Sequence, residues 1–380
     1  MVEHLGVPYR VTALAARKSV DRLLAQAQQV RPAAVAIADE ASCDAGASAL
    51  RELGAEVYRG AKGLVEMVAR DDVDIVVAAI VGAAGLPAAL AAVGAGKTLA
   101  LANKEALVVA GSLLMPLARS KKVPILPVDS EHSAIFQAMQ AGRRQDIKRV
   151  ILTASGGPFR NTPLDTMRDA TLADALAHPT WKMGNKVTID SATMFNKGLE
   201  LIEACWLFDL KPEQVEIVIH PESIVHSMVE FVDGSTIAQL SPPDMRTPIQ
   251  YALTYPDRLP GPAGRMDFAQ SLRLNFEPPD RKRFPAIDVA YDVATRGGTL
   301  GAVMNAANEA AVGAFVGGWI GFGEICETVQ ATIAAHRFQT DASLDDLLEA
   351  DRWAREYVET MIAKRVRETS ICIRQHGSNL

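Results

Sequence analysis

The chain has 380 residues, of which 49% are hydrophobic and 22% are charged, and its formal net charge is -6. This length allows more than one domain with a buried core, and the composition excludes a disordered protein. Because the net charge is negative and no run of lysine and arginine stands out, we expect no nucleic-acid partner.

The cysteines and the hydrophobic segments indicate the cellular setting. Cys43, Cys205, Cys326 and Cys372 are scattered without a Cys-x-x-Cys pair, which favours free thiols in a reducing compartment. The most hydrophobic region, 74–111, is interrupted by glycines and charged residues, so no segment has the roughly 20 apolar residues of a membrane span. The amino terminus has no signal-peptide pattern. We therefore expect a cytoplasmic protein with no membrane partner.

Strand and helix patterns alternate in the first part of the chain. Strands are expected at 9–15, 34–38, 56–58, 74–80 and 98–102, and helices at 20–30, 43–53 and 86–93. This alternation indicates βαβ units and a parallel sheet, as in a nucleotide-binding α/β domain. However, the Gly-x-Gly-x-x-Gly turn that holds a dinucleotide's pyrophosphate is not found, and Gly94-Ala95-Gly96 is interpreted as a helix C-cap. Either the fold binds no dinucleotide, or the first strand and its loop are missing from this sequence.

Two cations and a hydroxyl, Arg17, Lys18 and Ser19, follow the first expected strand. In a dinucleotide fold this position distinguishes a free ribose hydroxyl from a 2′-phosphate, and these residues favour the phosphate of NADPH. An ordinary solvated basic turn has the same composition, and the tripeptide alone favours that simpler interpretation.

The most informative stretch is 123–136, where an apolar run ends in Asp129, Ser130, Glu131 and His132. The carboxyl end of a buried strand delivers polar groups to a ligand crevice in this way, and two carboxylates one residue apart can hold a hard cation. An acidic helix start with Asp129 or Ser130 as N-cap is the alternative, and the stretch alone favours it.

Two further segments carry polar groups after the expected strand 149–153. The tight loop 154–159 contains two glycines that let the backbone approach a ligand, although a plain turn is equally consistent. The segment 174–186 contains His178 and Trp181 before a glycine and suits a mobile lid, although a surface loop with one buried tryptophan has the same pattern.

Residues 191–208 have the apolar spacing of a helix with a polar start. Glu200 and Glu203 lie near one face, and a cation is one way to pair a carboxylate among apolar neighbours. Ser191, Asn196 and Lys197 together could bind a phosphate. Helix capping with one salt bridge is the alternative, and this segment alone slightly favours it.

The rest of the chain predicts strands, a linker and helices. Strands are expected at 215–220, 225–231 and 236–239 with a turn at Asp233-Gly234, which implies a mixed or antiparallel sheet. Proline and glycine dominate the predicted linker 255–285. The following region to 364 is helical and includes Asn305 and Asn308, whose amides we expect to contribute to the cleft.

Six ordered motifs together closely resemble the 1-deoxy-D-xylulose-5-phosphate reductoisomerase family, and the resemblance runs from about residue 10 to about residue 359. They are Asn103-Lys104-Glu105, Asp129-Ser130-Glu131-His132, Ser155-Gly156-Gly157-Pro158-Phe159, His178-Pro179-x-Trp181, Asn196-Lys197-Gly198-Leu199-Glu200 and Asp244-Met245-Arg246-Thr247-Pro248. The resemblance implies an enzyme of non-mevalonate isoprenoid biosynthesis that rearranges 1-deoxy-D-xylulose 5-phosphate and reduces it to 2-C-methyl-D-erythritol 4-phosphate. It also implies NADPH, Mg²⁺ or Mn²⁺, a homodimer and inhibition by fosmidomycin.

Carried over by position, the resemblance assigns roles to residues of this chain. The implied metal ligands are Asp129, Glu131 and Glu200. The implied phosphate-binding groups are Ser155, Ser191, Asn196 and Lys197, and the other implied substrate contacts are Lys104, Ser130 and His178. The implied lid residues are Trp181 and Met183, and the implied cofactor contacts are Arg17, Lys18, Ser19, Asn103, Glu105 and Gly184.

The implied architecture is α/β. It comprises a Rossmann-like NADPH-binding domain at 1–128, a catalytic and dimerisation domain at 129–254 with a lid near 175–185, a linker at 255–285 and a helical domain at 286–380. The family's first strand and glycine-rich loop are not in this sequence, so we expect an incomplete sequence that binds NADPH weakly. The alternatives are another NADPH-dependent sugar-phosphate oxidoreductase, a catalytically impaired truncated form, and a ligand-sensing or scaffold protein.

Overall fold

The computed structural model describes the backbone of residues 1–377 and the side chains of residues 1–365. The described chain divides by its internal contacts into two compact units. Unit 1 contains 1–106, 114–133 and 244–264, and unit 2 contains 107–113, 134–243 and the chain from Arg265 onward. The domain boundaries predicted from the sequence were drawn by expected function, not by internal contacts, and they stay a prediction.

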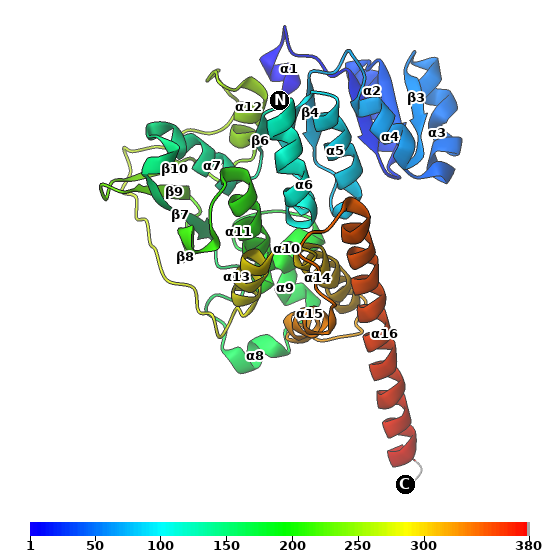
Figure 1. Ribbon diagram of the computed structural model, residues 1–380, viewed down its shortest axis with the longest axis vertical. Coiled ribbons are helices and arrows are strands. Elements are labelled where there is room, and N and C mark those ends of the chain that lie inside the picture. The colour runs from blue at the N-terminus through cyan, green and yellow to red at the C-terminus, as the bar shows by residue number, and fades with distance from the viewer. Residues whose placement is uncertain (378–380) are drawn as a thin grey trace. The chain divides into compact units, whose positions relative to one another are not determined.

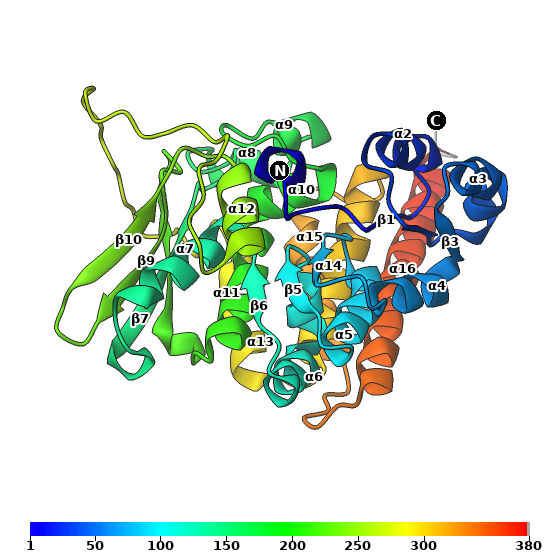
Figure 2. The same cartoon turned by 90° about the horizontal axis from the view of Figure 1, so that it is seen from above.

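Unit 1 contains two parallel sheets of three strands each. The first sheet and its helices are β1 (Ala13–Ala16), α2 (Val20–Val30), β2 (Ala34–Ile37), α3 (Glu40–Glu52), β3 (Glu56–Arg59) and α4 (Gly60–Val68), after the short α1 (Val2–Leu5). The second sheet and its helices are β4 (Ile75–Ala78), α5 (Leu86–Gly94), β5 (Thr98–Leu101), α6 (Glu105–Lys121) and β6 (Ile125–Pro127), with α12 (Arg246–Thr254) packed on β5 and β6. The α/β fold expected from the sequence is confirmed, and Figure 2 shows its parallel strands between helices.

The first sheet is stabilised by a central strand that is apolar throughout. Every residue of β2 is fully buried, as expected for a parallel strand covered by helices on both faces. The helix α3 begins at Glu40, three positions before the predicted 43, because the Asp39 carboxylate accepts a hydrogen bond of 3.0 Å from the amide of Ser42 and caps it. Gly96, at φ +78, ends α5 as predicted.

The strands of unit 1 do not form one continuous sheet. β1 and β4 are edge strands of separate sheets, and their residues are only partly buried. α4 bridges the two sheets, because it packs on both β2 and α5. In a doubly wound fold, a strand followed by a glycine-rich loop joins the two halves of the sheet. Among the residues that the structure describes, no strand pairs with both β1 and β4.

Unit 2 combines a mixed sheet with helices. Its strands are β7 (Ile147–Ala154), β8 (Val215–Ile219), β9 (Val225–Phe231) and β10 (Thr236–Leu240), in the order β10-β9-β7-β8. Its helices are α8 (Leu164–Arg168), α9 (Leu172–Leu176), α10 (Asn185–Thr193), α11 (Phe195–Phe208), α13 (Ala286–Arg296), α14 (Leu300–Val316), α15 (Glu324–Ala335) and α16 (Leu344–Gly377), preceded by α7 (Ser130–Ala138). The mixed sheet is confirmed, because β7 pairs with β8 in parallel and with β9 antiparallel.

Helices α11 and α14 form the centre of unit 2. α11 packs on β7 and β8 and on α13, and α14 packs on α15 and on the long α16 (Figure 1). Asn305 and Asn308 of α14 are fully buried, and the suggestion that their amides contribute to a cleft stays a prediction. The predicted linker contains neither helix nor strand, apart from one β-bridge between Ile219 and Glu277. Among the described helices, none is long and apolar enough to cross a membrane.

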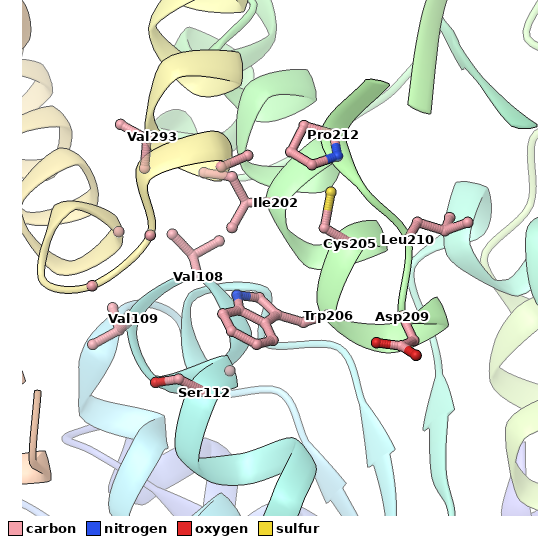
Figure 3. Close-up of a pocket in the computed structure, with 15 residues that line it drawn as sticks. Val108, Val109, Ser112, Ile202, Cys205, Trp206, Asp209, Leu210, Pro212 and Val293 are labelled. Atoms are coloured by element: carbon pink, nitrogen blue, oxygen red, sulfur yellow. The ribbon is translucent and has the colours of Figure 1, made fainter. Parts of the chain in front are cut away.

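A close contact joins α6 to α11 within unit 2. α6 is distorted at Ala110, and a Cβ built on the next residue, Gly111, would lie 2.4 Å from the ring of Trp206. A cavity of about 170 Å³ lies beside this contact, and Val108, Ile202, Cys205 and Trp206 line it (Figure 3). Glycine is therefore required at 111 for packing rather than for a turn.

We predict that Gly111→Ala destabilises the protein by about 1–3 kcal/mol, because the added methyl group overpacks the contact with Trp206. Gly313→Ala is the matched control, since Gly313 is an exposed position of α14 with nothing within 4 Å of its Cβ. We expect this control to stabilise the protein by about 0.5–1 kcal/mol. Urea unfolding of both variants is the measurement, and a shift of the same sign in both would contradict the packing argument.

Candidate functional site

Polar residues of unit 1 gather where β5 and β6 end. These strands pair in parallel, so Lys104 and Asp129, which follow them, lie at the same edge. The Lys104 ammonium lies 2.8 Å from the Asp129 carboxylate, and both side chains are largely buried. This ion pair combines a predicted substrate contact with a predicted metal ligand, a link that the sequence did not indicate.

The helix α7 begins at Ser130, directly after Asp129. The Ser130 hydroxyl donates a hydrogen bond of 2.7 Å to the Glu131 carboxylate, and the fully buried ring of His132 lies 3.9 Å from the Asp129 carboxylate. These carboxylates lie at a helix start, as one interpretation of the stretch expected, and their role as ligands of a hard cation stays a prediction.

Asn103 and Glu105 organise a loop of unit 1. The Asn103 amide donates to the carbonyl of Gly82 at 3.0 Å and to the Glu105 carboxylate at 2.8 Å, and its oxygen accepts from the amide of Ala106. Asn103 and Glu105 are both buried. These two predicted cofactor contacts therefore hold the loop that follows β4.

Arg17, Lys18 and Ser19 are exposed immediately after β1. The Lys18 ammonium lies 3.8 Å from the Asp39 carboxylate, which follows the neighbouring strand β2. Hydrogen bonds from Ser42 lower the pKa of Asp39, and Lys18 adds to that effect. The carboxyl edge of the first sheet therefore presents cations to solvent, and their contact with a 2′-phosphate stays a prediction.

The single helix predicted at 191–208 is two helices, α10 and α11, which meet at Met194. Met194 has a φ of 65°, in the left-handed region, and this turn places Asn196 and Lys197 at the start of α11. The Asn196 amide lies 2.5 Å from the Glu200 carboxylate, and the Lys197 ammonium pairs with the same carboxylate. Lys197 and Glu200 are 4% and 1% exposed, so a buried charge is compensated by its neighbour on the helix.

The glycine loop after β7 packs closely on the end of α10. Gly156 and Gly157 have φ values of +84° and +65°, and a Cβ at Gly157 would lie 2.7 Å from the carbonyl oxygen of Ser191. Only glycine allows this approach. The loop that begins at Ser155 therefore packs on the backbone of Ser191, and a shared phosphate site of these two residues stays a prediction.

His178 connects the glycine loop to the segment before α10. One ring nitrogen, Nε2, lies 3.1 Å from the Ser155 hydroxyl, and the other, Nδ1, accepts from the amides of Thr180 at 3.1 Å and Trp181 at 2.9 Å. Because two amides donate to Nδ1, the proton lies on Nε2 and is directed at Ser155. Burial lowers the pKa of His178, which keeps the ring neutral.

The residues predicted from the sequence thus occupy two groups, one in each unit. Unit 1 holds Lys104, Asp129, Ser130 and Glu131 together, and unit 2 holds Ser155, His178, Ser191, Asn196, Lys197 and Glu200 together. Met183 and Gly184 lie in the irregular segment before α10, which suits their predicted roles in a lid and a cofactor contact. The Trp181 ring lies 6.4 Å from that of His226, a residue of β9 that the sequence reasoning missed because a strand pattern does not distinguish it.

The cavity beside α11 lacks the groups that a catalytic site requires. It is lined by the thiol of Cys205 and by Asp209, together with mainly apolar side chains (Figure 3). Burial raises the pKa of Cys205 to about 12, so the thiol is protonated at neutral pH and is a poor nucleophile. This cavity therefore offers no activated nucleophile at Cys205.

Comparison with known protein families finds three matches along the chain. Residues 1–111 match the 1-deoxy-D-xylulose 5-phosphate reductoisomerase model. Residues 125–208 match the C-terminal domain model of the same enzyme, and residues 240–357 match the DXP reductoisomerase C-terminal domain. Together these models cover most of the chain.

Individual proteins give the same result. The 1-deoxy-D-xylulose 5-phosphate reductoisomerase of Chlorobaculum tepidum is 50% identical over 354 residues, 93% of each chain, and that of Chlorobium phaeobacteroides is 49% identical over 356 residues, 94% of this chain and 93% of the relative. The Zymomonas mobilis enzyme, solved with NADPH, is 45% identical with a TM-score of 0.87 and covers 93% of this chain and 92% of its own. A DOX-P reductoisomerase solved with NADPH, fosmidomycin and magnesium is 41% identical with a TM-score of 0.89 and covers 95% and 94%.

We predict that the turn at His178 opens as the pH falls below about 6.5, because a proton on Nδ1 would face two amide donors. The pKa of His178 is lowered in the folded protein, so its contribution to stability is present above the ordinary value and is lost as the pH falls through the folded one. The measurement is the hydrogen-exchange protection of the Thr180 and Trp181 amides as a function of pH.

His178→Asn is the control for this prediction, because the asparagine oxygen accepts hydrogen bonds but does not titrate. The neighbouring His226 also has a pKa lowered by burial, and it is retained in the control. An unchanged pH dependence in His178→Asn would assign the effect to another group.

Proposed function

The chain belongs to the 1-deoxy-D-xylulose 5-phosphate reductoisomerase family, and from that premise we propose how its own residues perform the reaction. It is an NADPH- and metal-dependent enzyme of isoprenoid biosynthesis that rearranges 1-deoxy-D-xylulose 5-phosphate and reduces it to 2-C-methyl-D-erythritol 4-phosphate. The observation that supports our assignment of residues is the pairing of each predicted site carboxylate with a cation or hydrogen-bond donor inside its own unit.

We propose that Asp129 and Glu131 of unit 1 and Glu200 of unit 2 bind the divalent ion. The donor set fits, because all three offer carboxylate oxygens, which Mg²⁺ and Mn²⁺ prefer. When bound, the ion polarises the carbonyl and the neighbouring hydroxyl of the substrate as a Lewis acid. Lys104, beside Asp129, adds positive charge where oxygen becomes negative, and Ser130 orients Glu131 through its hydroxyl.

The phosphate of the substrate would be bound by Ser155, Ser191, Asn196 and Lys197. Asn196 and Lys197 lie in the first turn of the long helix α11, where the helix dipole favours an anion. Lys197 would supply the charge, and the glycine loop after Ser155 packs on the backbone of Ser191. Binding at a phosphate distant from the reacting carbons provides energy that orients the sugar.

His178, Trp181 and Met183 would close over the substrate as a lid. The backbone of this segment is fixed to His178 by two hydrogen bonds, and His178 contacts Ser155. A phosphate at Ser155 therefore acts directly on the segment that excludes water. Fosmidomycin-type hydroxamates are expected to bind the same site and inhibit the enzyme.

NADPH would be bound through Arg17, Lys18 and Ser19 at its 2′-phosphate, with contributions from Asn103, Glu105 and Gly184. The exposed cations after β1 fit a phosphate, and Asn103 and Glu105 fix the loop at the end of β4. When bound, NADPH supplies the hydride for the reduction. Following the resemblance, we also propose a homodimer in the cytoplasm, which light scattering and cell fractionation would test.

We predict that Glu200→Gln and Asp129→Asn each weaken Mn²⁺ binding and lower kcat at least about 100-fold, because each removes a charged oxygen ligand. Mn²⁺ binding is measured by electron paramagnetic resonance, and turnover by NADPH oxidation with 1-deoxy-D-xylulose 5-phosphate. Glu213→Gln, at an exposed carboxylate, is the control and is expected to match the wild type. Wild-type Mn²⁺ affinity in Glu200→Gln would exclude that residue as a ligand.

We predict that Arg17→Ala and Lys18→Ala raise the KM for NADPH about tenfold or more and leave the KM for NADH nearly unchanged, because only NADPH carries the 2′-phosphate. Lys62→Ala removes an exposed cation of α4 and is the control. Equal losses for the two cofactors would show that these residues do not contact the 2′-phosphate.

A further inference from the structure

A buried carboxylate that the mechanism does not use lies next to the phosphate-binding groups. Asp190 is in the last turn of α10 and is 1% exposed, and it immediately precedes Ser191. Burying a carboxylate costs several kcal/mol unless it is paired and hydrogen-bonded. Its partners therefore indicate its role.

The two oxygens of Asp190 are bound by one side chain of α10 itself and by one from a distant helix of unit 2. Lys186, in the first turn of α10, places its ammonium 2.6 Å from Oδ2. Asn308, in the middle of α14, donates a hydrogen bond of 2.9 Å to Oδ1. Asp190 and Asn308 are buried and bound to each other, so we assign neither of them a contact with the substrate.

The helix α14 provides a rigid support for this pair. Asn305 and Asn308 are fully buried, and Glu309 on the same helix pairs with Arg355 of α16 at 2.8 Å. Arg355 is also bound to Asp351 at 2.8 Å. The Asn308 amide is thereby held by an element that the long helix α16 fixes in place.

The backbone of α10 has little freedom to compensate for a shift at Asp190. Its carboxyl end contacts the glycine loop, where a Cβ on Gly157 would lie 2.7 Å from the Ser191 carbonyl oxygen. After two more residues the chain turns at Met194 and enters α11 with Asn196 and Lys197. A displacement of α10 would therefore move Ser191 relative to Ser155 and also alter the start of α11.

We propose that Asp190 and Asn308 are positioning residues that set the affinity for the phosphate group of the substrate. By fixing α10 on α14, they place Ser191 opposite the glycine loop. This inference rests on the proposed function, in which Ser155 and Ser191 bind the phosphate. It accounts for the buried Asp190 carboxylate, which the proposed reaction does not use.

The test is Asn308→Asp, which places a second carboxylate against Asp190, together with Asp190→Asn, which keeps the volume of the side chain. We expect each variant to raise the KM for 1-deoxy-D-xylulose 5-phosphate and the Kd for inorganic phosphate about tenfold to a hundredfold, with a smaller change in kcat. The double variant D190N/N308D exchanges the amide and the carboxylate, so it is expected to recover most of the loss. Phosphate binding is measured by calorimetry.

Thr332→Val is the matched control, because Thr332 is fully buried and hydrogen-bonded to Thr328 within α15. Its Tm is expected to fall without a change in KM or in phosphate affinity. If Asn308→Asp and Asp190→Asn lower only the Tm, as the control does, the pair is merely structural and the inference is wrong.

A separate outcome concerns the proposed function. If the wild type binds inorganic phosphate but does not turn over the sugar phosphate, the proposed function fails while the positioning role is still measured by the phosphate Kd. A wild type that shows neither property would overturn both.

Discussion

The buried negative charge of Glu200 on α11 must be compensated, and this constraint determines how α11 begins and which side chains lie in its first turn. Glu200 is 1% exposed, and an unpaired carboxylate at that depth would be strongly destabilising. Lys197 and Asn196 satisfy it from the preceding turn, and this is possible because the left-handed Met194 ends α10 and starts a new helix at the required point. The side chains that we assign to metal and phosphate are therefore also those that make α11 stable in the core.

In both units, the side chains that pair with the site carboxylates are themselves residues to which we assign a role in the site. Lys104 neutralises Asp129 at the ends of two parallel strands, and Ser130 binds Glu131. Such pairs orient each carboxylate and compensate its charge. Stability and function are thus not separable at these positions, and a variant at either partner should be judged by both folding and binding.

The sequence pattern predicted the local structure well and the long-range pairing poorly. Helix α2 and strand β9 have the predicted bounds, and the polar groups at the end of β6 were recognised because that strand ending is visible in the apolar pattern. The division at Met194 was missed, since one left-handed residue leaves the apolar spacing intact. The bond between Asp190 and Asn308 joins residues 118 positions apart, and no local periodicity carries that information.

The discontinuity of unit 1 has a consequence for how the protein is made. Helix α12, which packs on β5 and β6, is encoded more than a hundred residues after those strands, and residues 134–243 of unit 2 are encoded in between. During synthesis the apolar face of these strands stays uncovered until residues 246–254 leave the ribosome. Completion of unit 1 must therefore wait for much of unit 2 to be translated, and a nascent chain that stops before α12 would expose a surface that chaperones recognise.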